Sequence, residues 1–106
     1  MKIEEYDHNL TDKDIIHVWM LKDKGKLLEV KIVYYFEDLK ERHQIVRYDC
    51  SHGYLHKHLL FEPKQQTEAV YAELTGKLVN GLIQELKQNF MEYRHQYLKN
   101  HAWWLK

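Results

Sequence analysis

The sequence predicts an α+β domain in which a four-stranded antiparallel meander sheet is packed by one long C-terminal helix. The pattern of apolar residues in residues 15–61 alternates with a period of two, which is typical of strands with one buried face. After Pro63 the period changes to about 3.6, which is typical of an amphipathic helix. Because the chain has 106 residues, of which 44% are hydrophobic, we expect one globular domain spanning residues 1–106.

The strands follow from the alternation and from the turn residues between its segments. Strands are expected at residues 15–22, 27–37, 42–50 and 56–61. Residues 23–26 read as a hairpin turn, in which Gly25 can adopt a left-handed backbone conformation. Residues 1–14 are polar and acidic, so they are expected to be either a loosely held lead-in or a short edge strand.

The helix is expected over about residues 66–98. Its apolar stripe consists of residues at helical spacing, namely Val70, Leu74, Leu78, Leu82, Leu86 and Phe90. A helix of this length extends roughly 50 Å, whereas an eight-residue strand extends roughly 27 Å. Either the helix breaks at Asn80-Gly81, or its second half overhangs the sheet and pairs with a second subunit. We favour the overhang and a homodimer, because the leucine spacing continues through Asn80 without a change of phase.

An aromatic tail at residues 100–106 follows the helix and contains Trp103 and Trp104. Two adjacent tryptophans at the end of a chain are expected to dock on the sheet, on a second subunit or on a partner.

Composition excludes several classes of protein. Lys plus Arg and Asp plus Glu are both 16, so the net charge predicts no strong sequence-independent attraction to nucleic acid. The single cysteine, Cys50, excludes an intramolecular disulfide and a zinc site with several cysteines. No segment reads as a secretion signal or a membrane span, so we expect a cytoplasmic protein with no membrane partner.

Residues 47–58 form the most unusual stretch of the chain. They hold three of the eight histidines together with an arginine, an aspartate, a lysine and two tyrosines. Strand alternation places Arg47 and Asp49 on one face and Tyr48 on the other, and it places His56 and His58 opposite Lys57. A plain hairpin would need an apolar inward face here, so we expect a functional site.

One interpretation of this stretch is a metal site. His52, His56 and His58 would surround a divalent ion such as zinc or manganese, with Asp49 as a further ligand or as a partner to a ligand histidine. The spacing of His56 and His58 favours this, because residues two apart on a strand point together.

A second interpretation is cleavage of RNA without a metal or other cofactor. Two histidines would serve as base and acid, and Arg47 or Lys57 would stabilise the charge that develops on the phosphorus. Tyr48 or Tyr54 would stack on a base, so Lys57 and Tyr54 are the candidate substrate-binding residues. The third interpretation is a polar hairpin without activity, in which Arg47 pairs with Asp49 and the histidines are solvated.

The motif Arg47-Tyr48-Asp49 followed by spaced histidines, between a strand meander and a long helix, resembles the TumE-like toxins of type II toxin–antitoxin systems and their uncharacterised relatives. The resemblance implies a toxin with a suspected nuclease activity and a helix-turn-helix antitoxin as partner. It also implies a catalytic set made of Arg47, Tyr48, Asp49, His52, His56 and His58. We therefore expect a TumE-like ribonuclease, and the alternative is a non-catalytic dimeric module that binds a metal or a protein partner.

Overall fold

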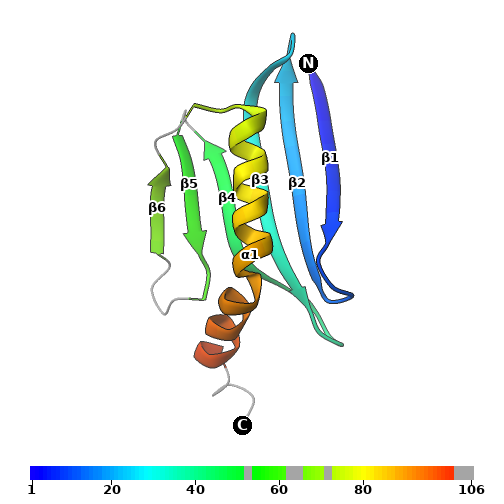
Figure 1. Ribbon diagram of the computed structural model, residues 1–106, viewed down its shortest axis with the longest axis vertical. Helices are drawn as coiled ribbons and strands as arrows, with labels where there is room; N and C mark the ends of the chain where they lie inside the picture. Colours follow the sequence, from blue (N-terminus) through cyan, green and yellow to red (C-terminus); the bar gives the residue numbers. More distant parts are fainter. Residues whose placement is uncertain (52–53, 62–65, 71–72, 102–106) are drawn as a thin grey trace.

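The part of the chain that the structure describes forms a single antiparallel sheet, which is crossed on one face by one helix (Figure 1). The computed structural model describes residues 1–51, 54–61, 66–70 and 73–101. The elements are β1 Lys2–Asn9, β2 Asp14–Asp23, β3 Lys26–Glu37, β4 Arg42–Ser51, β5 Tyr54–Leu59, β6 Gln66–Val70 and α1 Gly76–His101. The strands lie in the sheet in the order of the sequence, so the predicted α+β class and the meander are confirmed.

The described residues form a sheet of six strands, so the prediction of four was wrong. The added strands are the two edges. β1 pairs with β2 from Lys2↔Lys22 to Asn9↔Ile15, which confirms the edge-strand alternative for the start of the chain. β6 pairs with β5 over five residue pairs, where the helix was predicted to begin. Edge strands have one neighbour and tolerate many polar side chains, so neither of them shows a strong alternating pattern.

The helix begins ten residues later than predicted, at Gly76 rather than near residue 66. Thr75 precedes it, and the Thr75 Oγ1 atom accepts a hydrogen bond of 3.1 Å from the Leu78 amide, which caps the first turn. α1 continues through Asn80 and Gly81 to His101, so no break occurs at that pair.

The shorter helix removes the reason to expect an overhang. The 26 residues of α1 span roughly 39 Å, and the 12 residues of β3 span roughly 40 Å, so the two elements match in length. The Asn100 side-chain amide donates a hydrogen bond of 2.6 Å to the Phe61 carbonyl, which fastens the helix end to the segment after β5. A homodimer remains a prediction, and Trp103 and Trp104 lie outside the described residues.

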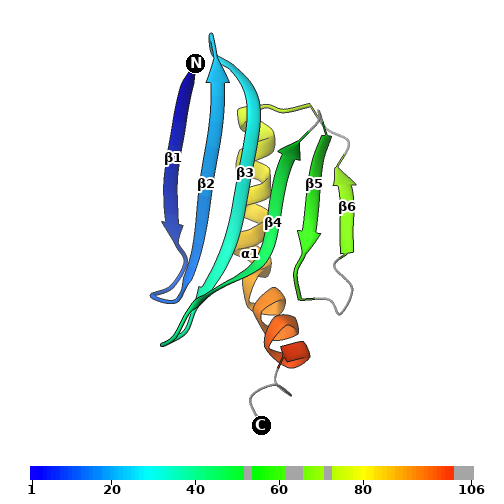
Figure 2. The ribbon, with the colours of Figure 1, turned by 180° about the vertical axis from the view of Figure 1, so that it is seen from behind.

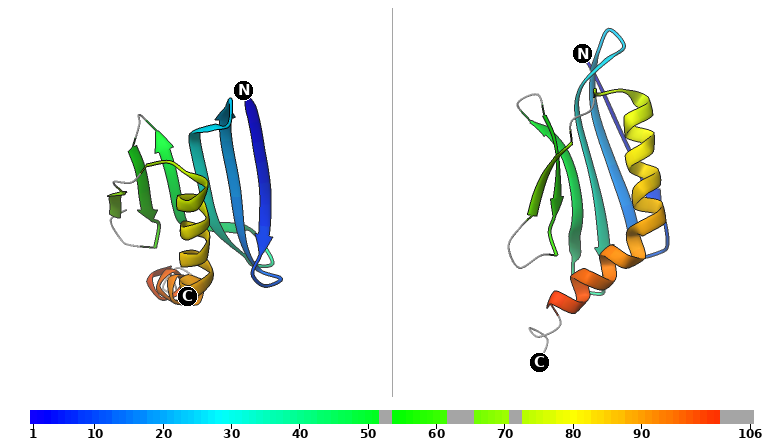
Figure 3. Two further views of the ribbon diagram at one scale, coloured as in Figure 1. Left: turned by 45° about the horizontal axis from the view of Figure 1, so that its top comes forward. Right: turned by 60° about the vertical axis from the view of Figure 1, so that its left-hand side comes forward.

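The core lies between α1 and one face of the sheet. Its fully or nearly fully buried members include Ile16, Val18, Ile32, Tyr34, Val46 and Tyr48 from the strands and Val79, Ile83 and Leu86 from the helix. The strand residues alternate along β2, β3 and β4, as expected for a sheet with one packed face. No described element covers the opposite face, here called the outer face (Figure 2). Figure 3 shows the same layering from the side, with α1 on one side of the sheet only.

The turn between β2 and β3 has the predicted form. Lys24 and Gly25 have φ values of 52° and 80°, and Asp23 pairs with Lys26 across the turn. Two successive residues with positive φ characterise the tight turns that match the twist of a hairpin.

A fully buried carboxylate, Asp14, ties the sheet to the helix. Its Oδ2 atom accepts hydrogen bonds from Thr11 Oγ1 at 2.6 Å and from Arg94 Nη1 at 2.7 Å. Its Oδ1 atom accepts a hydrogen bond from the Tyr34 hydroxyl. These four side chains, the Asp14 cluster, join the start of β2, the last third of β3 and the last third of α1.

On the outer face, His17 of β2 bridges two carboxylates of the edge strand β1. Its Nδ1 atom lies 2.5 Å from Asp7 Oδ1 and its Nε2 atom lies 2.7 Å from Glu5 Oε1. Both ring nitrogens can donate only when the imidazole is protonated. Partial burial acts to lower the pKa of His17, but the hydrogen bonds to Asp7 and Glu5 outweigh it and raise the pKa above its usual value.

The attachment of β1 is therefore expected to depend on pH. A raised pKa means that the stabilisation by His17 is fully present below about pH 6.5, the pKa of an unfolded histidine, and is lost as the pH rises through the folded pKa. Replacing His17 with glutamine should lower the free energy of unfolding by up to about 1 kcal/mol at pH 6 and by less at pH 9. Urea denaturation at both pH values measures this. The exposed His95→Gln variant serves as control, and an equal loss at both pH values for His17→Gln would contradict the bridge.

Candidate functional site

The hairpin of β4 and β5 brings four predicted site residues together on the outer face. Arg47 pairs with His58 and Asp49 pairs with His56 in the register of the two strands. Residues paired across strands have their side chains on the same face, so the two histidines, the arginine and the aspartate form one polar patch. These four residues are called the outer-face quartet below.

Asp49 lies at the centre of the quartet. Its Oδ2 atom is 2.9 Å from Arg47 Nε, and its Oδ1 atom is 3.4 Å from His58 Nε2. The other ring nitrogen of His58, Nδ1, is 3.2 Å from Thr67 Oγ1 on β6. The centroids of the His56 and His58 rings are 6.2 Å apart. Asp49 and Thr67 thus hold the His58 ring in place, whereas the His56 ring makes no hydrogen bond or ion pair with the described residues and lies beside the His58 ring.

Arg47 is placed by charge rather than by a directed hydrogen bond. Although its Nε atom is close to Asp49, the N–H is buried and makes no hydrogen bond with the described residues, because it is not directed at the carboxylate. The side chain is 30% exposed. Its guanidinium therefore keeps donors that an anionic group on the outer face could accept.

The structure places two other predicted site residues on the opposite face, under the helix. Tyr48 donates a hydrogen bond of 2.8 Å to Glu85 Oε2. Lys57 Nζ donates to Tyr93 Oη at 2.9 Å and to Glu85 Oε1 at 3.4 Å, and Tyr93 itself donates to Glu85 Oε1. These four residues, the Glu85 cluster, fasten α1 to β4 and β5. Tyr48 and Lys57 therefore lie on the opposite face of the sheet from the quartet.

The protonation of the Glu85 cluster agrees with a structural role. Burial, followed by the hydrogen bond to Glu85, raises the pKa of Tyr48 far above neutral pH, so its hydroxyl remains a donor. Burial acts to lower the pKa of Lys57, but Tyr93 and Glu85 outweigh it and raise the pKa, so the ammonium remains charged. Neither group is available as a general base.

The remaining predicted residues lie partly outside what the structure describes. His52 is outside the described residues, and so is the side chain of Tyr54, although its backbone pairs with Ser51 in the hairpin. Within the described ranges, no group of three or more His, Cys, Asp or Glu side chains could hold a metal ion. The predicted metal site requires His52, so the described residues do not show where its ligands would meet.

Sequence reasoning missed a hollow of about 470 Å³ on the same outer face. Asp49 of the quartet lines this hollow. The other lining residues include aromatic and charged side chains of the neighbouring strands, among them His17, Trp19, Lys31 and Tyr35. Lys31 pairs directly with Asp49 in the sheet, so the hollow continues from the quartet toward β2. Strand alternation puts these residues on one face, but the hollow itself arises from long-range pairing that the sequence does not show.

A family profile covers nearly the whole domain. Residues 1–103 match the family described as a domain of unknown function, DUF7718. The chain belongs to the DUF7718 family. No curated protein and no solved structure matches this DUF7718 domain. Among its described residues, α1 is not apolar enough to cross a membrane.

Proposed function

We propose that this DUF7718 protein is a ribonuclease whose site is the outer-face quartet. The observation that carries the proposal is the pairing of Arg47 with His58 and of Asp49 with His56, which puts two imidazoles, a guanidinium and a carboxylate on an uncovered sheet face. The resemblance of this motif to TumE-like toxins supports the same assignment, and with it a helix-turn-helix antitoxin as partner.

The contacts of the two histidines favour different roles. The ring of His58 is held between Asp49 Oδ1, 3.4 Å from its Nε2 atom, and Thr67 Oγ1, 3.2 Å from its Nδ1 atom, so His58 is assigned as the general acid with a fixed orientation. His56 has no such partner among the described residues and is assigned as the general base. Their centroids are 6.2 Å apart, close enough for both rings to contact one phosphodiester.

The proposed reaction is an intramolecular transfer at phosphorus. His56 takes the proton of the ribose 2′-hydroxyl as its oxygen forms a bond to phosphorus. The bond from phosphorus to the 5′-oxygen breaks, and His58 gives that oxygen a proton. The products are a 2′,3′-cyclic phosphate and a free 5′-hydroxyl. Arg47 supplies donors to the non-bridging oxygens as negative charge accumulates on them.

The surroundings of the quartet provide a place for the nucleobases. Trp19 and Tyr35 line the adjoining hollow, and Lys31 adds a positive charge next to Asp49. Aromatic side chains on an open sheet face can stack on unpaired bases, which is a common way to bind single-stranded RNA.

The test is cleavage of several single-stranded RNAs by the purified protein, with and without a chelator. The His56→Ala, His58→Ala double variant should lose at least about 100-fold in rate, which is the low end of general acid–base catalysis. A His8→Ala, His95→Ala double variant removes two histidines elsewhere and should retain activity. The cyclic phosphate end should be detectable on the product.

The other outcomes separate the alternatives. Loss of cleavage in chelator, with rescue by zinc or manganese, would replace the metal-free mechanism with a metal site that includes His52. Absence of cleavage on every RNA would overturn the ribonuclease proposal and leave the quartet as a charged surface of a binding module.

A further inference from the structure

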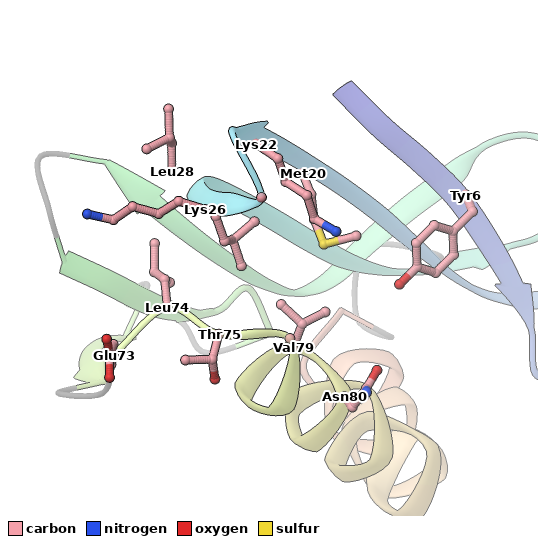
Figure 4. Close-up of a pocket in the computed structure, with 13 residues that line it drawn as sticks. Tyr6, Met20, Lys22, Lys26, Leu28, Glu73, Leu74, Thr75, Val79 and Asn80 are labelled. Carbon is pink, nitrogen blue, oxygen red and sulfur yellow. The ribbon is translucent and has the colours of Figure 1, made fainter. Parts of the chain in front are cut away.

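A second cavity lies on the other face of the sheet, at the start of the helix (Figure 4). It has a volume of about 830 Å³ and is bounded by β1, by the hairpin of β2 and β3, and by the first turns of α1. No residue of the quartet lines it. Its volume falls within the range of about 300–1,000 Å³ that is common for small-molecule sites.

The inner wall of this cavity is apolar and well packed. Met20, Leu27 and Val79 line it, and each is at least 92% buried, with exposed fractions of 6%, 8% and 2%. Figure 4 shows Met20 and Val79 directed toward each other from β2 and α1. Leu74 adds a partly buried side chain from the segment before the helix. Such a wall suits an alkyl or aryl group, because burying apolar surface is favourable by roughly 25 cal/mol per Å².

The charged residues of the rim favour an anion. Two lysines, Lys22 and Lys26, line the cavity against a single carboxylate, Glu73. Lys22 Nζ is paired with Glu4 Oε2 at 3.2 Å. Lys26 makes no ion pair or side-chain hydrogen bond with the described residues, and the carboxylate of its cross-strand partner, Asp23, lies 4.0 Å from the N-terminal ammonium. The first turn of α1 also contains no acidic residue to oppose an anion there.

We propose that this cavity binds a small organic anion with an apolar body, such as a medium-chain carboxylate. Its carboxylate would pair with Lys26, and its chain would lie against Met20, Leu27 and Val79. This site is separate from the proposed ribonuclease site, since it lies on the opposite face of the sheet and shares no lining residue with the quartet.

The first experiment is a titration of the full-length protein, labelled with ¹⁵N, with octanoate. Amide shifts should concentrate at the residues that line the cavity and should saturate. Octylammonium has the same chain with the opposite charge, and it should bind at least about 5-fold more weakly if Lys26 selects for an anion. Equal binding of the two compounds, or octanoate shifts spread over the outer face, would overturn the proposal.

A matched pair of glycine variants tests the location. A Cβ atom added at Gly76 or at Gly81 meets no atom within 4 Å, so neither position is closed to a side chain at its first atom. Of these two glycines, Gly76 lines the cavity and Gly81 does not. Gly76→Trp should therefore weaken octanoate binding by at least about 10-fold by filling the space, and Gly81→Trp should leave it within about 2-fold. Unchanged binding to a folded Gly76→Trp variant would refute the assignment.

A second pair tests the charge independently of any filling of the cavity. Lys26→Gln should weaken octanoate binding by about 3- to 5-fold, the range of a solvated ion pair. Lys24→Gln removes a lysine of the same hairpin that does not line the cavity, and it should have no effect. Equal effects of the two variants would show general attraction to a basic hairpin and would contradict the pairing with Lys26.

Discussion

Replacing Asp14 with alanine is expected to lower the free energy of unfolding by about 3–5 kcal/mol. Asp14 is fully buried, and its carboxylate accepts from Thr11, Arg94 and Tyr34. Truncation would leave the Arg94 guanidinium without its counter-charge and the buried Tyr34 hydroxyl without an acceptor. An unpaired buried donor costs about 1–3 kcal/mol, and a buried ion pair that loses one partner costs more.

Urea denaturation of the variant beside the wild type measures this effect. Asp12→Ala is the matched control, because Asp12 is an exposed aspartate two residues away and should change stability by less than about 0.5 kcal/mol. Arg94→Met should also destabilise, since it leaves the Asp14 carboxylate buried without its cation. A loss below about 1 kcal/mol for Asp14→Ala would mean that the Asp14 cluster does not fasten α1 to the sheet.

The central part of the fold was accessible from the sequence because local patterning determines it. The alternation in β2, β3 and β4 reflects one packed face, and Gly25 marks a turn that requires positive φ. The face of each site residue also followed from alternation, so the convergence of Arg47, Asp49, His56 and His58 was predictable. These features depend on neighbours in sequence or on a single hairpin.

The rest of the fold depends on partners that are distant in sequence. Val70 and Leu74 are four residues apart and fit a helical stripe, but residue 70 ends β6 and residue 74 precedes α1. Residues 66–70 form a strand rather than a helix because they make backbone hydrogen bonds with β5. The spacing of apolar residues along the sequence does not reveal this pairing. Polar β1 is held in the same way by β2.

The division of the candidate residues between the two faces has the same origin. Tyr48 and Lys57 were assigned to the site by the resemblance and by the RNA-cleavage interpretation, although alternation puts them on the face opposite the quartet. Glu85, the acceptor they share, is 37 residues from Tyr48 and 28 from Lys57. Arg94 is 80 residues from Asp14. A sequence motif does not show such distant partners. A site defined by the motif alone therefore combines residues that contact the helix with residues on the outer face.

The separation of the two faces gives the Glu85→Ala variant a distinctive expected result. Glu85 accepts from Tyr48, Lys57 and Tyr93, and the Tyr48 side chain is almost fully buried. Loss of the Glu85 carboxylate leaves the buried Tyr48 hydroxyl without an acceptor and the partly buried Lys57 ammonium without a counter-charge. We expect the free energy of unfolding to fall by about 2–4 kcal/mol. Glu92→Ala, at an exposed position on the same helix, should cost less than about 0.5 kcal/mol.

The same variant separates stability from the proposed activity. Well below its melting temperature, Glu85→Ala should cleave RNA at a rate per folded molecule close to that of the wild type, because the quartet is on the other side of the sheet. The His56→Ala, His58→Ala variant should show the reverse, with little change in urea denaturation and loss of cleavage. If Glu85→Ala abolished cleavage while folded, Tyr48 and Lys57 would act in the reaction after all. The division of residues 47–58 between a packing face and a reactive face would then be wrong.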